Sequence, residues 1–195
     1  MSRYDVNQDQ YCYKETDVLI NKLNLHDQAS LEKAEARHTS LAISRVNFAP
    51  PPYNLNYLKR LHEELFKDIY FWAGEIRNVD ISKNSTRFCN CTRIQPEAEK
   101  IFRELETKNW LVSLSFEDFV AEISHYFCEL NVIHPFREGN GRSQRLLFEH
   151  IALHNDYFLD WSSISKDEWV LANVAGFHSN LTPLKQIFHR SLTLL

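Results

Sequence analysis

The clearest pattern in this sequence is an apolar stripe that begins just after Ser115 and ends at Leu130. Its large side chains recur three or four positions apart, which is the spacing of one helix face: Phe116, Phe119, Val120, Ile123, Phe127 and Leu130. Ser115 with Asp118 resembles a capping box at the start of this helix. Residues 143–153 are apolar on more than one side, as in a buried helix. The pattern predicts two helices joined by a short loop.

Other segments show the same helical spacing. Apolar residues at mixed spacings of three and four predict helices over four further ranges: 18–25, 31–46, 53–70 and 97–105. Gly74 follows the third range closely and is interpreted as the stop of that helix. Ser165 to Glu168, and Thr182 with Pro183, resemble the caps of two closing helices.

Between Arg77 and Arg93 the pattern changes to alternation. Val79 and Ile81 alternate with polar residues, and Asn84 with Ser85 offers a turn before a second short run. This predicts one β-hairpin. Since strands and helices do not alternate along the chain, a parallel sheet is not expected. The predicted fold class is all-α with a short β-hairpin flap.

Length and composition favour one domain over residues 1–195. The chain is too short for two ordinary domains and has no compositional linker. Its formal net charge of −4 lacks the basic surplus of proteins that bind phosphate backbones, so nucleic acid is not an expected partner. The polar start and the short apolar runs predict neither a secretion signal nor a membrane span, and a cytoplasmic protein is expected.

The four cysteines lack the paired C-x-x-C spacing of a structural zinc site, and reduced thiols are expected in a cytoplasmic protein. Cys89 and Cys91 with scattered histidines would be a weak metal site. Metal analysis after chelation would test that reading.

The loop between the two central helices carries the residues best suited to chemistry. Gly139 and Gly141 allow backbone N–H groups to curl around an anion at the start of the second helix, whose dipole adds positive potential. Glu138 beside such a site suggests Mg²⁺, which is usually held by carboxylate and phosphate oxygens together. The loop therefore predicts a magnesium-bound phosphate.

Three further side chains complete this prediction. Arg142 and Arg145 lie three positions apart on one helix face, where they can fork onto phosphate oxygens. His134, at the other end of the loop, is a competent base near neutral pH. Taken singly, a histidine is more often structural, a Gly-x-Gly is usually a turn, and a glutamate or an arginine pair is usually solvated. Their occurrence in this order within twelve residues is what indicates a site.

This stretch resembles the signature of the Fic family, His-Pro-Phe-x-(Asp/Glu)-Gly-Asn-Gly-Arg-x-x-Arg, at every specified position from His134 to Arg145. The resemblance extends to residues 71–77 and the following hairpin, to Ala172 with Asn173, and to the opening residues 11–23. It implies a mostly helical fold and a protein adenylyltransferase, which uses Mg-ATP to place AMP on a Tyr, Ser or Thr hydroxyl of a target protein.

The resemblance also implies a role for each matching residue. His134 would deprotonate the target hydroxyl, Glu138 would hold Mg²⁺, and Asn140 with the amides of Gly139 and Gly141 would fix the α-phosphate. Arg142 and Arg145 would bind the outer phosphates. The remaining nucleotide-binding residues would be Asn173 on the adenosine side and the hairpin residues Ile81, Ser82, Lys83 and Asn84, which would also pair with an extended segment of the target.

Gly141 separates this sequence from the Doc-like kinases of the family, which have lysine there, so AMP transfer is favoured over phosphorylation. Two alternatives stay open. Another donor, such as UMP or a phosphocholine compound, would use the same loop. A non-catalytic docking module would need neither His134 nor Glu138.

Many Fic proteins are inhibited by a helix bearing Ser/Thr-x-x-x-Glu-Gly/Asn. The nearest match here is Ser113 to Glu117, but Asp118 follows it and the segment is better interpreted as a helix cap. The resemblance to the bacterial Fic toxins therefore predicts a small separate antitoxin whose glutamate pairs with Arg145. It also makes bacterial topoisomerases, DNA gyrase above all, the leading target proteins.

Overall fold

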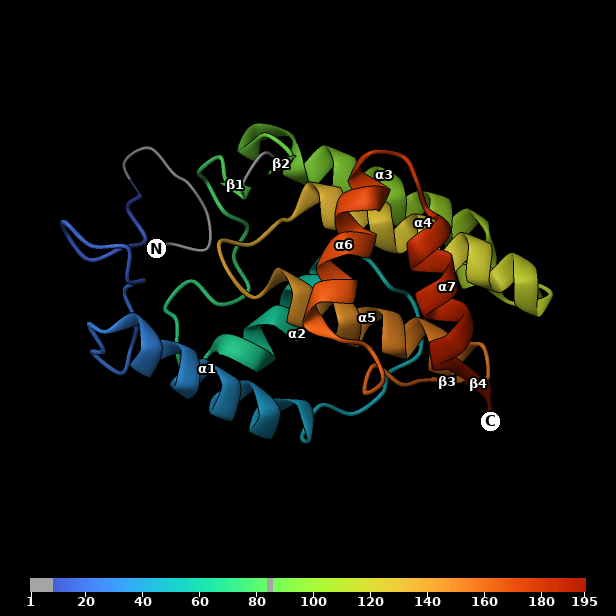
Figure 1. The fold of residues 1–195 in the computed structure, drawn as a ribbon, viewed down its shortest axis with the longest axis horizontal. Coiled ribbons are helices and arrows are strands. Elements are labelled where there is room, and N and C mark those ends of the chain that lie inside the picture. The colour runs from blue at the N-terminus through green and yellow to red at the C-terminus, as the bar shows by residue number, and fades with distance from the viewer. Residues whose placement is uncertain (1–8, 84–85) are drawn as a thin grey trace.

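The computed structural model describes residues 9–83 and 86–195, so Asn84 lies outside the described residues. The fold is mostly helical, and the expected fold class is confirmed (Figure 1). Its α-helices are α1 (Gln28–Ile43), α2 (Leu55–Phe66), α3 (Ile94–Thr107), α4 (Phe116–Ile133), α5 (Asn140–His154), α6 (Lys166–Phe177) and α7 (Thr182–Ser191). Two short 3₁₀ helices cover Cys91–Arg93 and Asn109–Leu111.

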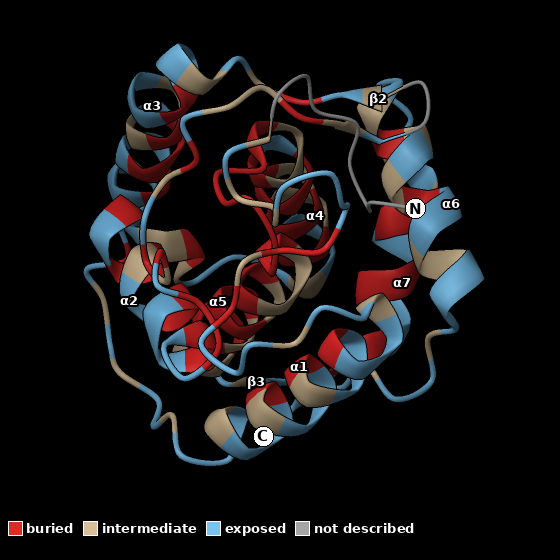
Figure 2. Cartoon of the chain, turned by 90° about the vertical axis from the view of Figure 1, so that its left-hand side faces the viewer, coloured by how far each residue is buried: buried red, intermediate tan, exposed pale blue. Residues whose placement is uncertain are grey.

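Helices α4 and α5 form the centre of the fold, as their apolar patterns predict. Both contribute many buried residues, and α5 also packs against α2 and the strand that follows it. Figure 2 shows the buried residues of α4 and α5 in the interior, with exposed faces of α3, α1 and α6 on the outside. The loop between these two helices is therefore held on both sides by buried helices of the core.

The predicted caps explain where two helices begin. The Ser115 hydroxyl accepts a hydrogen bond from the Asp118 backbone N–H at 3.2 Å, and Ser165 does the same for Glu168 at 3.2 Å. Helix α7 begins at Thr182 with proline in its first turn, and the Asn180 side chain accepts the Thr182 N–H at 3.1 Å.

The predicted helix over residues 18–25 is wrong. Leu19 instead forms an isolated antiparallel bridge with Cys12, and Asn24 has a φ of 53°. The Asn21 side chain donates to the carbonyls of Leu19 and Leu25 and accepts from the Leu25 N–H. Such local side-chain bonds offer the backbone an alternative to helical pairing.

The position predicted for the end of the second helix is also wrong. Helix α2 ends at Phe66, and the Ile69 N–H bonds to the Phe66 carbonyl in a tighter turn of three residues. Gly74 lies well beyond it with a φ of 84°. Its N–H donates to the Nδ1 atom of His62, so this glycine positions a side chain of α2.

Within the described residues, four short strands form two antiparallel pairs. The expected hairpin pairs β1 (Ser82–Lys83) with β2 (Thr86–Arg87), and Ser82 lies opposite Arg87. The second pair was not expected from sequence. It joins β3 (Tyr157–Leu159) to β4 (Leu192–Leu194) near the end of the chain.

Most buried apolar side chains form one cluster, whereas Ile81 and Phe88 form a small separate one beneath the hairpin. All four cysteines are free thiols. Among the described residues, no helix combines the length and the apolar character that a membrane crossing requires.

Candidate active site

The loop between α4 and α5 is shaped by a left-handed residue at each side. His134 ends α4 with a φ of 50°, and Gly139 precedes α5 with a φ of 82°. A Cβ atom on Gly139 would lie 2.3 Å from two ring atoms of Phe66, so only glycine fits there. The tight packing against α2 sets the path of the loop into α5.

His134 is buried at the end of α4. Its Nδ1 atom lies 3.0 Å from the Asn131 carbonyl oxygen, and its ring stacks on Phe88 with centroids 3.9 Å apart. A neutral ring in this position carries its hydrogen on Nδ1 and its lone pair on Nε2. Burial lowers the pKa of His134 to about 4, against the opposing effects of the Asn131 hydrogen bond and the charge of Glu138. The ring is thus a neutral base across the physiological range.

Glu138 lies in the middle of the loop with its carboxylate close to its own backbone. Its Oε1 atom accepts the Gly139 N–H at 2.8 Å and lies 3.4 Å from Arg142 Nη2. Its backbone carbonyl accepts from His62 Nε2 at 2.9 Å. Both the carboxylate and the main chain at this position are therefore fixed by neighbours.

Asn140 closes the loop on itself. Its Oδ1 atom accepts the Phe136 N–H at 2.8 Å, and its Nδ2 atom donates to the Phe136 carbonyl at 2.7 Å. Gly141 lies in the first turn of α5, where an added Cβ would meet Arg145 at an ordinary 3.8 Å. The N-cap residue Gly139 has no side chain to cap this helix, and the N-terminus of a helix favours an anion, a role that the Glu138 carboxylate now fills at the Gly139 N–H.

The two predicted arginines differ in their partners. Arg142 pairs with Glu35 of α1 at 2.6 Å and lies over the Phe66 ring. Arg145 lies over the Trp169 ring, 5.7 Å from its centroid, and forms no ion pair or hydrogen bond with any residue that the structure describes. Burial and the nearby charge of Arg142 lower the pKa of Arg145, and the charge of Glu149 opposes them only in part, so an incoming anion would be stabilised at this position.

The described hairpin residues lie beside the loop in different environments. Ile81 is buried against Phe88, which itself covers His134. Ser82 is half-buried and Lys83 is exposed. The charge of Lys83 acts on His134 and lowers its pKa slightly, so this lysine lies on the base side of the loop. The structure thus brings the described part of the hairpin to the same site.

Asn173 lies on α6 with its two polar atoms in different situations. Its Nδ2 atom donates to the Trp169 carbonyl at 2.8 Å. Its Oδ1 atom is buried without a hydrogen-bond partner among the described residues. Since a buried acceptor is costly to leave unpaired, this atom fits a ligand that brings a donor.

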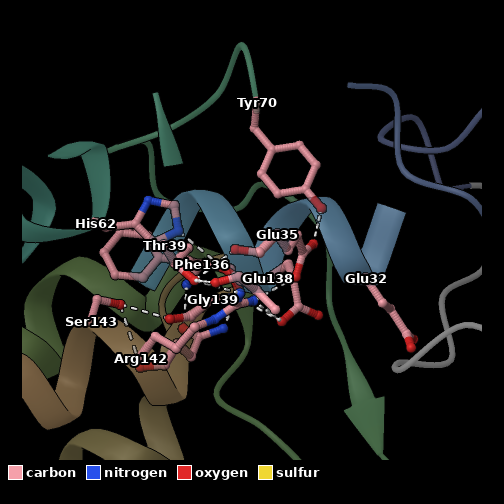
Figure 3. Close-up of polar contacts among 12 residues, drawn as sticks. Glu32, Glu35, Thr39, His62, Tyr70, Phe136, Glu138, Gly139, Arg142 and Ser143 are labelled. Carbon is pink, nitrogen blue, oxygen red and sulfur yellow. Dashed lines mark hydrogen bonds and ion pairs between the residues drawn. The ribbon is translucent and has the colours of Figure 1, made fainter. Parts of the chain in front are cut away.

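Four side chains that the sequence analysis did not select support the loop. Arg77, which is buried, donates to carbonyls at the end of α4, and His62 bridges Gly74 to Glu138. Glu35 and Tyr70 hydrogen-bond to each other beside Arg142 (Figure 3). A local signal does exist for Glu35, because it follows buried Leu31 by four positions on the inner face of α1. A charged residue on a buried helix face indicates a specific partner.

Comparisons with known proteins show which family this chain belongs to. A sequence profile of the Fic/DOC family matches residues 52–152, which include the loop, all of α4 and nearly all of α5. The chain belongs to the Fic/DOC family. It is 38% identical over 188 residues to Probable protein adenylyltransferase Fic of Escherichia coli K12, covering 96% of this chain and 94% of that protein. It is 33% identical to protein adenylyltransferase VbhT of Bartonella schoenbuchensis, covering 99% of this chain but 41% of VbhT.

Solved structures of the family share the whole architecture. The BepC protein of Bartonella tribocorum with bound AMPPNP has a TM-score of 0.87 at 26% identity, with 95% of this chain and 97% of that one covered. A Fic domain of Bartonella quintana with bound ADP has a TM-score of 0.88 at 29% identity, with 94% of each chain covered. Family members of this fold therefore bind adenine nucleotides.

The side chains of this site fit a nucleotide and a magnesium ion together. Glu138 supplies one carboxylate, and the described residues offer no cluster of three His, Cys, Asp or Glu that would hold a metal alone. Mg²⁺ is commonly bound by one or two carboxylates and substrate phosphates. Among the described residues, Arg145 forms no ion pair and Asn173 has a buried acceptor without a hydrogen-bond partner, as a triphosphate and a nucleoside would require.

Proposed function

We propose that this protein is an adenylyltransferase that transfers AMP from Mg-ATP to a hydroxyl side chain of another protein. The observation that carries the proposal is the fixed tautomer of His134, whose Nδ1 atom lies 3.0 Å from the Asn131 carbonyl. The lone pair is then on Nε2, in a loop that ends at the N-terminus of α5. A base and an anion site within one loop are what hydroxyl attack on a phosphate needs.

The transfer is a displacement at the α-phosphorus. The target oxygen forms a bond to this phosphorus while the bond to the bridging oxygen of the β-phosphate breaks, and the hydroxyl proton goes to Nε2 of His134. Diphosphate leaves with the bonding electron pair. Mg²⁺ bound at Glu138 would supply charge neutralisation for the phosphates.

The other residues bind and orient the nucleotide in this proposal. Arg142 and Arg145 contact the outer phosphates, where guanidinium groups offset the charge that develops on diphosphate. Asn140 holds the loop closed. The amides of Gly139 and Gly141 would face the α-phosphate once Glu138, which accepts the Gly139 N–H at 2.8 Å, turns to Mg²⁺. Asn173 accepts a hydrogen bond from the adenosine side. The hairpin residues Ile81, Ser82 and Lys83 line the nucleotide and guide the target segment, and Asn84, which lies outside the described residues, would have the same role.

Transfer of label from ATP to protein tests the function. The purified protein is incubated with α-³²P-ATP, Mg²⁺ and a bacterial lysate, beside the His134→Ala variant. We expect labelled protein bands that depend on His134, with a rate loss of about a hundredfold or more in the variant. Label that persists unchanged in His134→Ala would contradict the role of His134. Parallel reactions with labelled UTP and CDP-choline would identify a different donor.

A toxin role in the bacterial cytoplasm, inhibited by a small separate antitoxin, extends this proposal. Arg145 forms no ion pair with a carboxylate among the described residues, although the charge of Glu149 acts on it, and this supports an incoming glutamate. The nearest internal match to the inhibitory motif does not supply one: Glu117 lies in the first turn of α4 and its side chain is 77% exposed. Expression alone should arrest growth, and co-expression of the small neighbouring reading frame should restore it. Harmless expression of an active enzyme would exclude the toxin role.

Bacterial topoisomerases are the targets we propose, DNA gyrase first and topoisomerase IV second. The support is the resemblance of the whole chain to the bacterial Fic toxins. Purified gyrase incubated with the protein and labelled ATP should incorporate AMP at a tyrosine, serine or threonine and lose supercoiling activity. Labelling of other lysate proteins with unmodified gyrase would contradict this target and leave the transferase activity in place.

A further inference from the structure

Arg142 lies between carboxylates from two distant parts of the chain (Figure 3). Its Nη2 atom lies 2.6 Å from Oε2 of Glu35 on α1 and 3.4 Å from Oε1 of Glu138 in the loop. Its Nη1 atom lies 3.5 Å from the Thr39 hydroxyl, and its guanidinium covers the Phe66 ring. The guanidinium is thus held on the α1 side of the loop.

Glu35 is held in place from two directions. The Tyr70 hydroxyl donates a hydrogen bond to its Oε1 atom while Arg142 donates to Oε2. The residue is 3% exposed, and Tyr70 is completely buried. A carboxylate in such surroundings is strongly destabilised without its cation, so the pair with Arg142 is an obligatory part of the packing.

The two distances show which carboxylate is the stronger partner of Arg142. Charge-assisted hydrogen bonds between nitrogen and oxygen are usually about 2.7–2.9 Å long. The contact with Glu35 is a close one, whereas the contact with Glu138 is long and weak. Arg142 and Glu138 are four positions apart in sequence, a spacing at which side chains readily pair. Without Glu35, the remaining carboxylate would attract the guanidinium more closely.

We propose that Glu35 is a positioning residue that keeps the Arg142 guanidinium from closing onto Glu138. This inference rests on the proposed function, in which Glu138 binds Mg²⁺ and Arg142 binds phosphate. A close Arg142–Glu138 pair would neutralise both groups and must be broken before either binds its ligand. The contact between α1 and α5 thus keeps the metal-binding and phosphate-binding charges separate.

The test measures how strongly Mg²⁺ enhances nucleotide binding. Calorimetry with a non-hydrolysable ATP analogue, in Mg²⁺ and in EDTA, gives two dissociation constants whose ratio is the magnesium enhancement. Glu35→Gln keeps the size of the side chain and removes its charge. We expect the enhancement to fall about tenfold in this variant, the scale of one charge-assisted contact. Tyr70→Phe, which removes one support of Glu35, should reduce it by about two- to threefold.

Leu31→Ala is the matched control for a merely structural effect. Leu31 lies on the same buried face of α1, is 1% exposed and belongs to the apolar core. Its truncation should lower the melting temperature and leave the magnesium enhancement at the wild-type value. An unchanged enhancement in Glu35→Gln, or an equal fall in Leu31→Ala, would overturn the proposal alone. Absence of nucleotide binding by the wild-type protein would overturn the proposed function and the role of Glu35 with it.

Discussion

At the scale of single residues, the most consequential feature is the environment of His134. The Phe88 ring covers one face of its imidazole at 3.9 Å, and the Asn131 carbonyl fixes its Nδ1 atom. Burial favours the neutral ring and lowers its pKa to about 4. A base with a lowered pKa is weaker, but it remains unprotonated throughout the physiological pH range.

This environment predicts the pH dependence of AMP transfer. Because the protonated ring cannot accept a proton, kcat/KM should stay level from pH 8 to about 5 and fall as the pH approaches 4, the pKa of His134. Phe88→Ala exposes the ring and should move the acid limb upward, toward pH 6.5. Rates measured at subsaturating nucleotide and target would follow this limb.

Circular dichroism over the same pH range separates loss of the base from acid unfolding. If kcat/KM of the wild-type protein fell with a midpoint near pH 6.5, burial would not be what sets the pKa of His134. If the acid limb of the pH profile lay at the same pH in Phe88→Ala as in the wild-type protein, the stacked Phe88 ring would not contribute to the low pKa of His134.

At the scale of elements, the N-terminus of α5 depends on two glycines for different reasons. Gly139 has a φ of 82° and faces the Phe66 ring of α2, where a Cβ would lie 2.3 Å away. Gly141 lies in the helical first turn, where a Cβ meets only the tip of Arg145 at 3.8 Å. Helix α2 therefore dictates the first glycine, and the fold does not dictate the second.

The two glycines should respond differently to alanine. Gly139→Ala combines a left-handed backbone with overpacking against α2, so its free energy of unfolding should fall by roughly 2–5 kcal/mol. Gly141→Ala should change it by no more than about 1 kcal/mol, because alanine is favourable within a helix. Urea unfolding of both variants measures the difference. Equal stabilities would contradict the packing of the loop against Phe66.

At the scale of the whole molecule, Arg77 joins parts of the chain that are distant in sequence. Its guanidinium donates to the His134 carbonyl at 2.8 Å and the Ile133 carbonyl at 3.2 Å, at the end of α4. It also donates to Val79 at 2.6 Å and to Cys89 at 2.5 Å, on either side of the hairpin. One buried side chain thus aligns the hairpin with the base.

Arg77→Lys tests this connection. A single ammonium group cannot reach four carbonyls in different directions, and buried carbonyls would lose their donors. We expect the free energy of unfolding to fall by roughly 2–4 kcal/mol. The matched control is Arg87→Lys, whose pair with Asp80 is exposed and should contribute less than about 1 kcal/mol. Similar unfolding midpoints for the two variants would contradict a bridging role for Arg77.

The sequence by itself determined the features that depend on neighbours along the chain. The stripe of α4, the caps at Ser115 and Ser165, the hairpin and the loop from His134 to Arg145 all follow from local spacing. The candidate site could be predicted from sequence for the same reason, since most of its predicted residues lie within twelve consecutive positions. Local periodicity encodes such features directly.

Only the tertiary structure decided the features that join distant positions. Glu35, His62 and Arg77 reach the loop from other elements, and β4 pairs with β3 across two intervening helices. The segment over residues 18–25 departs from its apolar spacing because Asn21 satisfies backbone groups that a helix would have used. The spacing of apolar residues along a chain predicts which face of a segment is buried. The partner of a buried charge, however, is determined only when the segments pack against one another.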